Sequence, residues 1–175
     1  MSIAGGFGFI HDELDTKVLI LYVLHRLPAR INAEKLAELV LIDGGIGYFD
    51  YKQCLCELIE SSHVDETEEG CLITAKGSRN CEILADSLPY SVRMKANKVT
   101  APVAEEMRRE AMILANHERT EGGVTVYLAL SDGVGSIFDL KILAAGEEQA
   151  EKIERSFRRK AEEYYNRFIT ELSED

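Results

Sequence analysis

The stretch from Gly47 to Asp86 constrains the fold of this chain more than any other part of the sequence, because its patterns predict a helix, a two-stranded hairpin and a second helix in succession. Apolar residues within 48–62 recur at the spacing of one helical face. They are Tyr51, Leu55, Leu58 and Ile59. An extended run then starts at His63, an acidic turn reverses it, and a short strand returns before Thr74. The hydroxyl of Thr74 can cap the helix that follows.

The sequence ahead of this stretch predicts two more helices. Val18–Leu24 is apolar throughout, and its periodicity alone fits a helix or a buried strand. Acidic residues before it, basic residues after it and the stop at Pro28 favour a helix from Asp12 to Leu27. Asn32 is placed to cap the next helix. A helix that is apolar on nearly every side must be covered by several neighbours.

The sequence also resembles known families. The helix, the acidic turn and the Leu72–Gly77 segment resemble the recognition helix, wing and Thr-x-x-Gly turn of PadR-like and MarR-like regulators. Segments 11–24, 47–50 and 87–93 are similar to an uncharacterised bacterial winged-helix family that is known only as a domain of unknown function. The first likeness covers about half of the chain and the second covers most of it. Together they imply a winged helix-turn-helix and a regulatory role, but no reaction.

The charge of the chain weighs against the DNA binding that the resemblance implies. The net charge is -11, and residues 1–88 hold seven Lys or Arg against fifteen Asp or Glu. DNA binding requires cations that replace the counterions condensed on the phosphates, and acids at the tip of a wing are repelled by those phosphates. We therefore carry two hypotheses. The first is a DNA-binding transcriptional regulator of winged-helix type, and the alternative is an acidic winged helix that serves as a protein–protein interaction module.

Two groups of residues are the candidates for contacts with double-stranded DNA. The first turns of a reading helix reach base edges, which selects side chains at the start of the helix over 48–62. The most basic short segment, 88–98, is predicted to be a solvated linker, and the alternative interpretation is an arm that contacts phosphates. The base-reading candidates are Tyr48, Lys52 and Gln53, and the phosphate-contacting candidates are Arg93, Lys95 and Lys98.

The second half predicts a helix, a β-hairpin and a helix. Pro102 is placed to open a helix that continues to about Arg119. Strands over 124–131 and 134–143 flank Asp132–Gly133, a pair that favours a type I′ turn. The fold class is therefore α+β, with a winged-helix domain at residues 1–88 and a helix–hairpin–helix domain at residues 89–175.

The last helix, from near Glu147, has a long apolar seam that predicts a homodimer. A lone hairpin is marginally stable in water, so it must lie on helices or extend another sheet. We expect the seam to supply a dimerisation surface. The interface candidates are Ile153, Phe157, Tyr164 and Phe168.

The remaining chemistry of the sequence favours a protein that is not an enzyme. No nucleophile with a base, phosphate loop or cluster of metal ligands can be recognised, so no cofactor or metal is expected. Cys54 and Cys56 stand two apart on a helix and point to different faces, which does not suit joint metal binding. Without an export signal or a long apolar span, we expect a cytoplasmic protein with reduced thiols that does not enter membranes.

Overall fold

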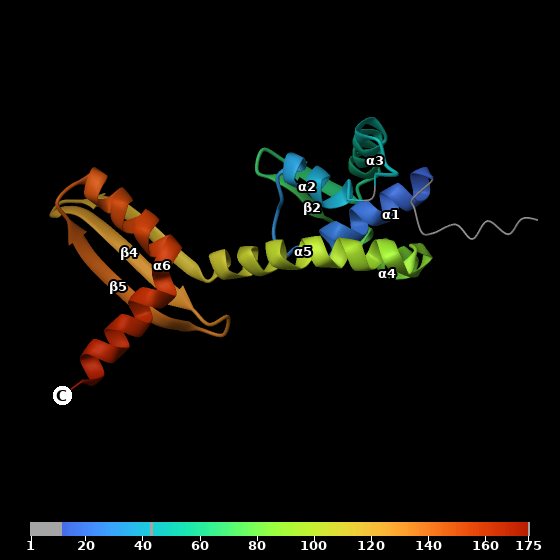
Figure 1. Cartoon of the computed structure of the whole chain (residues 1–175). Helices are drawn as coiled ribbons and strands as arrows, with labels where there is room; N and C mark the ends of the chain where they lie inside the picture. Colours follow the sequence, from blue (N-terminus) through green and yellow to red (C-terminus); the bar gives the residue numbers. More distant parts are fainter. Residues whose placement is uncertain (1–11, 43, 175) are drawn as a thin grey trace, which may run out of the picture. The chain divides into compact units, whose positions relative to one another are not determined.

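The computed structural model describes residues 12–42 and 44–174. In this part of the chain six α-helices, one 3-10 turn and two small antiparallel sheets are present, which makes the fold mixed α and β (Figure 1). The chain divides into two compact units between Met107 and Arg108.

The first unit consists mainly of helices. Its elements are α1 (Glu13–Leu24), α2 (Ala33–Val40), α3 (Tyr48–Glu60), β1 (Val64–Thr67), β2 (Gly70–Ile73), α4 (Ala75–Leu84), the 3-10 turn η1 (Ala85–Ser87) and α5 (Tyr90–Ala111). The predicted helix, hairpin and helix of residues 47–86 are confirmed as α3, β1–β2 and α4.

The helix α1 is the centre of this unit. All seven residues from Val18 to Leu24 are buried, which confirms that this apolar run is a helix covered on several sides. Helices α2, α3 and α4 contact it, and the Tyr22 hydroxyl donates to Asn97 Oδ1 of α5 at 3.1 Å. The side chain of Asp12 caps α1 by accepting from the Asp15 amide. This cap explains why the helix begins where the acidic residues cluster.

The hairpin β1–β2 is joined to the chain ahead of α2. Ile31 and Cys71 exchange two backbone hydrogen bonds of 3.0 and 2.8 Å, which adds a short bridge to the edge of β2. Gly70 has φ +118°, and a Cβ atom there would lie 2.3 Å from the carbonyl oxygen of Ile31. Only glycine permits this approach, so the residue that ends the acidic turn also fixes the bridge.

The helix α5 corrects the predicted linker and the predicted helix start at Pro102. It runs without a break from Tyr90 to Ala111, with Pro102 in its interior. The residues that bury one face recur every four positions, which is a helical signal that the basic residues between them obscured. They are Val92, Ala96, Thr100 and Ala104. The expected domain boundary between residues 88 and 89 lies just before the start of this continuous helix. The two compact units divide later, between residues 107 and 108.

The second unit is a three-stranded sheet with one helix. Its elements are β3 (Ile113–Thr120), β4 (Gly123–Ser131), β5 (Ser136–Ala144) and α6 (Glu147–Ser173). The prediction that a helix continues to Arg119 is wrong, because 113–120 pairs with β4 in the register Ala115 with Leu128. The segment alternates between covered and exposed positions, a pattern too short and polar to be distinguished locally from a helix end.

The hairpin β4–β5 is confirmed, but its turn differs from the predicted one. A type I′ turn needs positive φ at both central residues. Gly133 has φ +88°, while Asp132 is not among the described residues with positive φ. The connection is instead a four-residue loop in which Asp132 Oδ1 accepts from the amides of Val134 and Gly135 at 2.8 and 2.9 Å.

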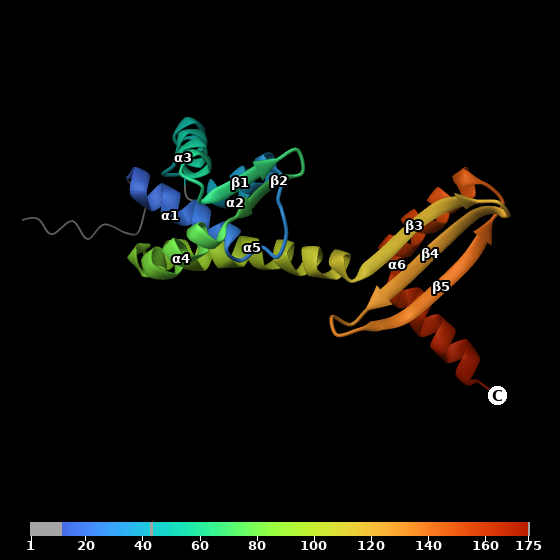
Figure 2. The ribbon, with the colours of Figure 1, turned by 180° about the vertical axis from the view of Figure 1, so that it is seen from behind.

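The helix α6 covers one face of this sheet, in front of it in Figure 1 and behind it in Figure 2. The second core forms there, from Val126, Leu128 and Leu130 of β4 and from Ala150, Phe157 and Ala161 of α6. The backbone departs from helical geometry at Lys160. The apolar seam is therefore buried at its centre within the chain, while Phe168 and Leu172 near its end are 41% and 80% exposed.

Candidate functional site

The start of α3 presents two aromatic side chains to solvent. Tyr48 is 52% exposed and Phe49 is 86% exposed. Their rings lie 6.4 Å apart in an edge-to-face arrangement. Tyr51 is instead fully buried, and its hydroxyl donates to the carbonyl oxygen of Ala33 at 3.3 Å. Burial of Tyr51 fixes which face of α3 is turned inward, so Phe49, two positions earlier, points outward. Tyr48 stands three positions before Tyr51, with its ring 6.3 Å from the Tyr51 ring, and is half-exposed at the margin of the outward surface.

The structure brings the three base-reading candidates together, but among carboxylates. Lys52 is half-buried and its Nζ lies 5.9 Å from the centre of the Tyr48 ring. The Gln53 amide donates to Glu57 Oε1 at 3.0 Å. Gln53 also lines a depression of about 300 Å³ whose other lining residues include Asp12, Glu13 and Asp50. A phosphate close to Gln53 would therefore meet negative charge.

Lys17 of α1 faces α3, and its charge is already used in ion pairs with two acids. The ammonium of Lys17 contacts carboxylate oxygens of Glu13 and Glu57, and so links α1 to α3. The hydrogen bonds that Lys17 donates to these two carboxylates raise its pKa. The hydrogen bond from Lys17 is the main cause that lowers the pKa of Glu57. Lys17 therefore offers little net charge to a polyanion.

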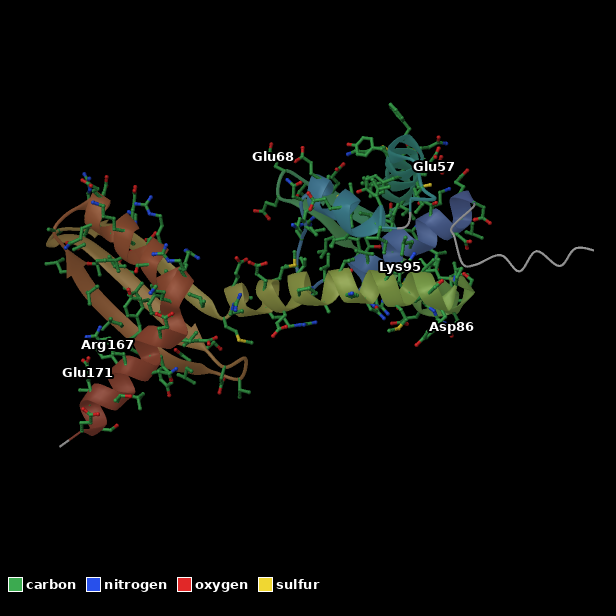
Figure 3. The ribbon with its side chains drawn as sticks, in the orientation of Figure 1. Glu57, Glu68, Asp86, Lys95, Arg167 and Glu171 are labelled. Atoms are coloured by element: carbon green, nitrogen blue, oxygen red, sulfur yellow. The ribbon has the colours of Figure 1, made fainter. Side chains whose placement is uncertain are left out.

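The hairpin that would be the wing is acidic and exposed. Its exposed acids are Asp65, Glu66, Glu68 and Glu69. Figure 3 shows Glu68 at the outer end of the hairpin. The nearby cation, Arg30, forms an ion pair with Asp65, and it donates to the Gly70 carbonyl oxygen at 3.2 Å. The arginine thus holds the hairpin in place instead of pointing toward a ligand.

The three phosphate-contacting candidates lie on α5. Arg93 is paired with Asp86 of η1, while Lys95 and Lys98 are exposed. In Figures 1 and 2 α1 lies between α3 and α5, and Figure 3 shows Lys95 on α5 well away from Glu68. The cations of α5 and the reading candidates of α3 are therefore carried on helices that α1 separates.

The four dimer candidates line one cavity in the second unit. It has a volume of about 380 Å³ and lies between α6 and strands β4 and β5. Ile153, Phe157, Tyr164 and Phe168 all contribute to its wall. Phe157 is only 2% exposed and stacks on Phe138 at a ring distance of 5.9 Å. Phe157 therefore belongs to the core of its own chain, and Phe168 is the most exposed of the four.

Cys54 and Cys56 point to different faces of α3, as their spacing predicted. Cys54 is buried and Cys56 is exposed. Burial raises the pKa of Cys54 and of Cys81, and it is the main cause that raises the pKa of Cys71 to about 11. These three thiols remain protonated near neutral pH, which makes them poor nucleophiles.

Sequence reasoning did not identify Phe49 as a candidate residue. It considered the apolar face formed by Tyr51, Leu55 and Leu58, and Phe49 does not belong to that face. A large aromatic residue that breaks the helical period at a helix start is the signal that could have found it.

No helix in residues 12–42 and 44–174 is both long and apolar enough to cross a membrane. The same residues contain no group of three or more potential metal ligands. No curated protein and no solved structure is significantly similar to the chain. Residues 16–172 match the family described as "Domain of unknown function (DUF4364)", and the chain therefore belongs to this family.

Proposed function

We propose that the first unit is a winged helix and that its α3 and β1–β2 surface binds a protein partner, so that the chain acts as a non-enzymatic interaction module. The order α1, α2, α3, β1, β2 supports a winged helix, because α3 is followed directly by a two-stranded hairpin. The resemblance of segments 11–24 and 47–50 to a winged-helix family supports the same assignment.

The exposure of Phe49 carries the proposal. A phenylalanine that is 86% exposed beside a half-exposed tyrosine leaves a large apolar area in water. Aromatic side chains supply much of the binding energy of protein interfaces, where a polar rim surrounds them. Here Asp50 is exposed next to Phe49 on α3, and the exposed acids of the hairpin that contacts α3 extend this polar surface.

The charge of this surface selects the class of partner. Asp65, Glu66, Glu68 and Glu69 repel the phosphates of a nucleic acid, and two of the nearby cations, Lys17 and Arg30, are held in ion pairs. The same acids attract Lys and Arg. The partner we propose is therefore a basic protein segment that carries an aromatic or aliphatic anchor for Tyr48 and Phe49.

Selection of a random peptide library on the immobilised full chain tests this proposal. Enriched peptides should combine Lys or Arg with an apolar anchor, and their binding should weaken as the salt concentration rises. Phe49→Ala and Tyr48→Ala should each weaken binding by tenfold or more, which corresponds to about 1.4 kcal/mol. Ile83→Ala is the matched control, because Ile83 is 76% exposed on α4. Equal binding by Phe49→Ala and the unmodified chain would refute the proposal.

A DNA-binding transcriptional regulator is the second candidate, and the position of three side chains favours it. Tyr48, Lys52 and Gln53 occupy the first turns of α3, where a reading helix meets base edges. Arg93, Lys95 and Lys98 would then supply the phosphate contacts. The logarithm of the binding constant should fall only slightly with the logarithm of the salt concentration, with a slope of roughly -0.9 per phosphate neutralised.

A titration against a pool of genomic fragments at low and moderate salt distinguishes the two candidates. If the chain reads DNA, Lys52→Ala should relax its sequence preference. Arg93→Ala and Lys95→Ala should instead weaken binding to all sequences alike. Retention of no fragment even at low salt would exclude the regulator and leave the protein-binding module.

A further inference from the structure

The sheet of the second unit has two edges, and α6 protects only one of them within the described residues. The strand order is β3-β4-β5, so β3 and β5 are the edges. Arg158 of α6 donates to the backbone oxygen of Ala115 in β3. Glu154 of α6 pairs with His117 of the same strand at 2.6 Å. These contacts place polar side chains of α6 along β3, which is how many proteins protect an edge from pairing.

The strand β5 is covered less well on both of its faces. On the face toward α6, Phe138, Leu140 and Ile142 of β5 are half-buried, whereas Val126, Leu128 and Leu130 of β4 are buried. On the opposite face, Ile137 is 42% exposed and Leu143 is 66% exposed. A nine-residue edge strand with apolar residues on both faces is a template for pairing with another strand.

We propose that β5 pairs antiparallel with β5 of a second copy of this chain, about a twofold axis at Leu140, so that two three-stranded sheets form one continuous sheet of six strands. The sequence of β5 is self-complementary in this register. Asp139 stands opposite Lys141 of the second copy, and Ile137 stands opposite Leu143 of the second copy. Each pair occurs twice, because a twofold interface repeats every contact.

Charge complementarity favours a second copy over an unrelated strand. Opposite charges directly across an antiparallel pair stabilise it, and like charges destabilise it. Charged residues on an edge often serve only to prevent pairing. Asp139 and Lys141, however, have opposite signs and flank the strand centre symmetrically, so they attract in a twofold pair. Pairing would also cover Ile137 and Leu143 with each other.

The end of α6 supplies a second, independent reason. The helix has 27 residues and is therefore about 40 Å long, longer than the nine-residue strand that it crosses. In Figure 2 its C-terminal end projects beyond the outer edge of β5. Phe168 contacts Phe138 of β5 at a ring distance of 5.5 Å. Beyond this contact Ile169 and Leu172 are 50% and 80% exposed.

The overhang of α6 lies where a second sheet would continue. Ile169 and Leu172 would cover the inner face of the second copy's β5, where Phe138, Leu140 and Ile142 are half-buried. Arg167 and Glu171 form an ion pair of 2.7 Å on the same end of α6, which Figure 3 shows, and this pair would form part of the polar rim. This interface does not depend on what α3 binds.

Charge reversal in the full chain tests the proposal. Asp139 and Lys141 are both exposed, so single reversals should preserve the fold, which circular dichroism verifies. The Lys141 ammonium lies 5.1 Å from the centre of the Tyr127 ring, so Lys141→Asp also removes this cation–π contact. Asp139→Lys reverses a charge and leaves the contact in place. Sedimentation analysis of the unmodified chain should show a dimer. Lys141→Asp and Asp139→Lys should each weaken dimerisation by about tenfold or more, since two attractive pairs become repulsive.

Two complementary measurements identify the register. An equimolar mixture of the Lys141→Asp chain and the Asp139→Lys chain should restore the dimer, because opposite charges then face each other at both sites. The double reversal D139K/K141D should also restore it. A monomeric unmodified chain would overturn the proposal. Single reversals that dimerise as well as the unmodified chain would also overturn it, because the interface would then lie elsewhere. No nucleic acid or peptide is present, so either failure leaves the proposed function untouched.

Discussion

The Nε2 atom of His63 accepts a hydrogen bond from the side-chain amide of Asn80 at 2.7 Å, which joins the start of the β1–β2 hairpin to α4. The Nδ1 atom of the same ring lies 2.8 Å from the hydroxyl oxygen of Ser61. The amide can donate to Nε2 only while that nitrogen carries no proton, so this contact requires a neutral ring. Burial, followed by the charge of Lys76, lowers the pKa of His63.

This lowered pKa predicts a loss of stability in mild acid. The unfolded chain binds a proton at the ordinary pKa of 6.5, and the folded chain binds it only at lower pH. The contribution of His63 is therefore fully present above the ordinary pKa and is lost as the pH falls through the lowered value. The urea midpoint should fall between about pH 7.5 and about pH 5.5. It should fall less in His63→Gln, and an equal fall in both proteins would contradict the assignment.

The Thr74 cap predicts a stability loss that serine prevents. The Thr74 hydroxyl oxygen accepts from the Gly77 amide at 3.1 Å, and the hydroxyl donates to the Ser62 carbonyl oxygen at 2.8 Å. Thr74→Ala should lower the free energy of unfolding by about 1 kcal/mol, since the first turn of α4 loses its cap. Urea titration of Thr74→Ser is the control, and it should recover most of the loss.

The close approach at Gly77 predicts that alanine is not tolerated there. A Cβ atom would lie 2.2 Å from the His63 carbonyl oxygen and 2.9 Å from a side-chain carbon of Ile73. Gly77→Ala should therefore cost roughly 1–3 kcal/mol, despite the better helix propensity of alanine. Gly122→Ala should be nearly neutral in the same thermal melts, because nothing lies within 4 Å of its added atom. A stabilised Gly77→Ala chain would show that the hairpin and α4 are packed differently.

Phe157 and Phe168 should respond differently to truncation. Phe157 is 2% exposed in the core of the second unit, so Phe157→Ala should cost about 3–5 kcal/mol. Phe168 is 41% exposed, and Phe168→Ala should lower stability much less while weakening self-association. Denaturation of each variant, together with its sedimentation, separates these effects. Comparable unfolding of both variants would mean that Phe168 belongs to the core as much as Phe157 does.

The sequence by itself determined the elements whose signals are local. Each of these signals lies within a few residues. They are the apolar run of α1 with its acidic start, the Thr74 cap of α4, and the alternation of apolar and polar residues in β4 and β5. The spacing of Cys54 and Cys56 likewise determined that they point to different faces of α3. Such signals are reliable because the same residues that form the pattern also make the contacts.

Only the tertiary structure decided the elements whose signals are weak or distant. The segment 113–120 is a strand because β4 offers it a complete ladder of backbone partners, and no property of its own sequence requires that choice. The α5 helix passes through Pro102 because a face of small residues is buried against the first core. The exposure of Phe49, the burial of Phe157 and the open edge of β5 likewise depend on which neighbours the fold supplies. Hydrophobic burial and strand pairing join residues far apart in the chain, and a local pattern cannot show which partners they will find.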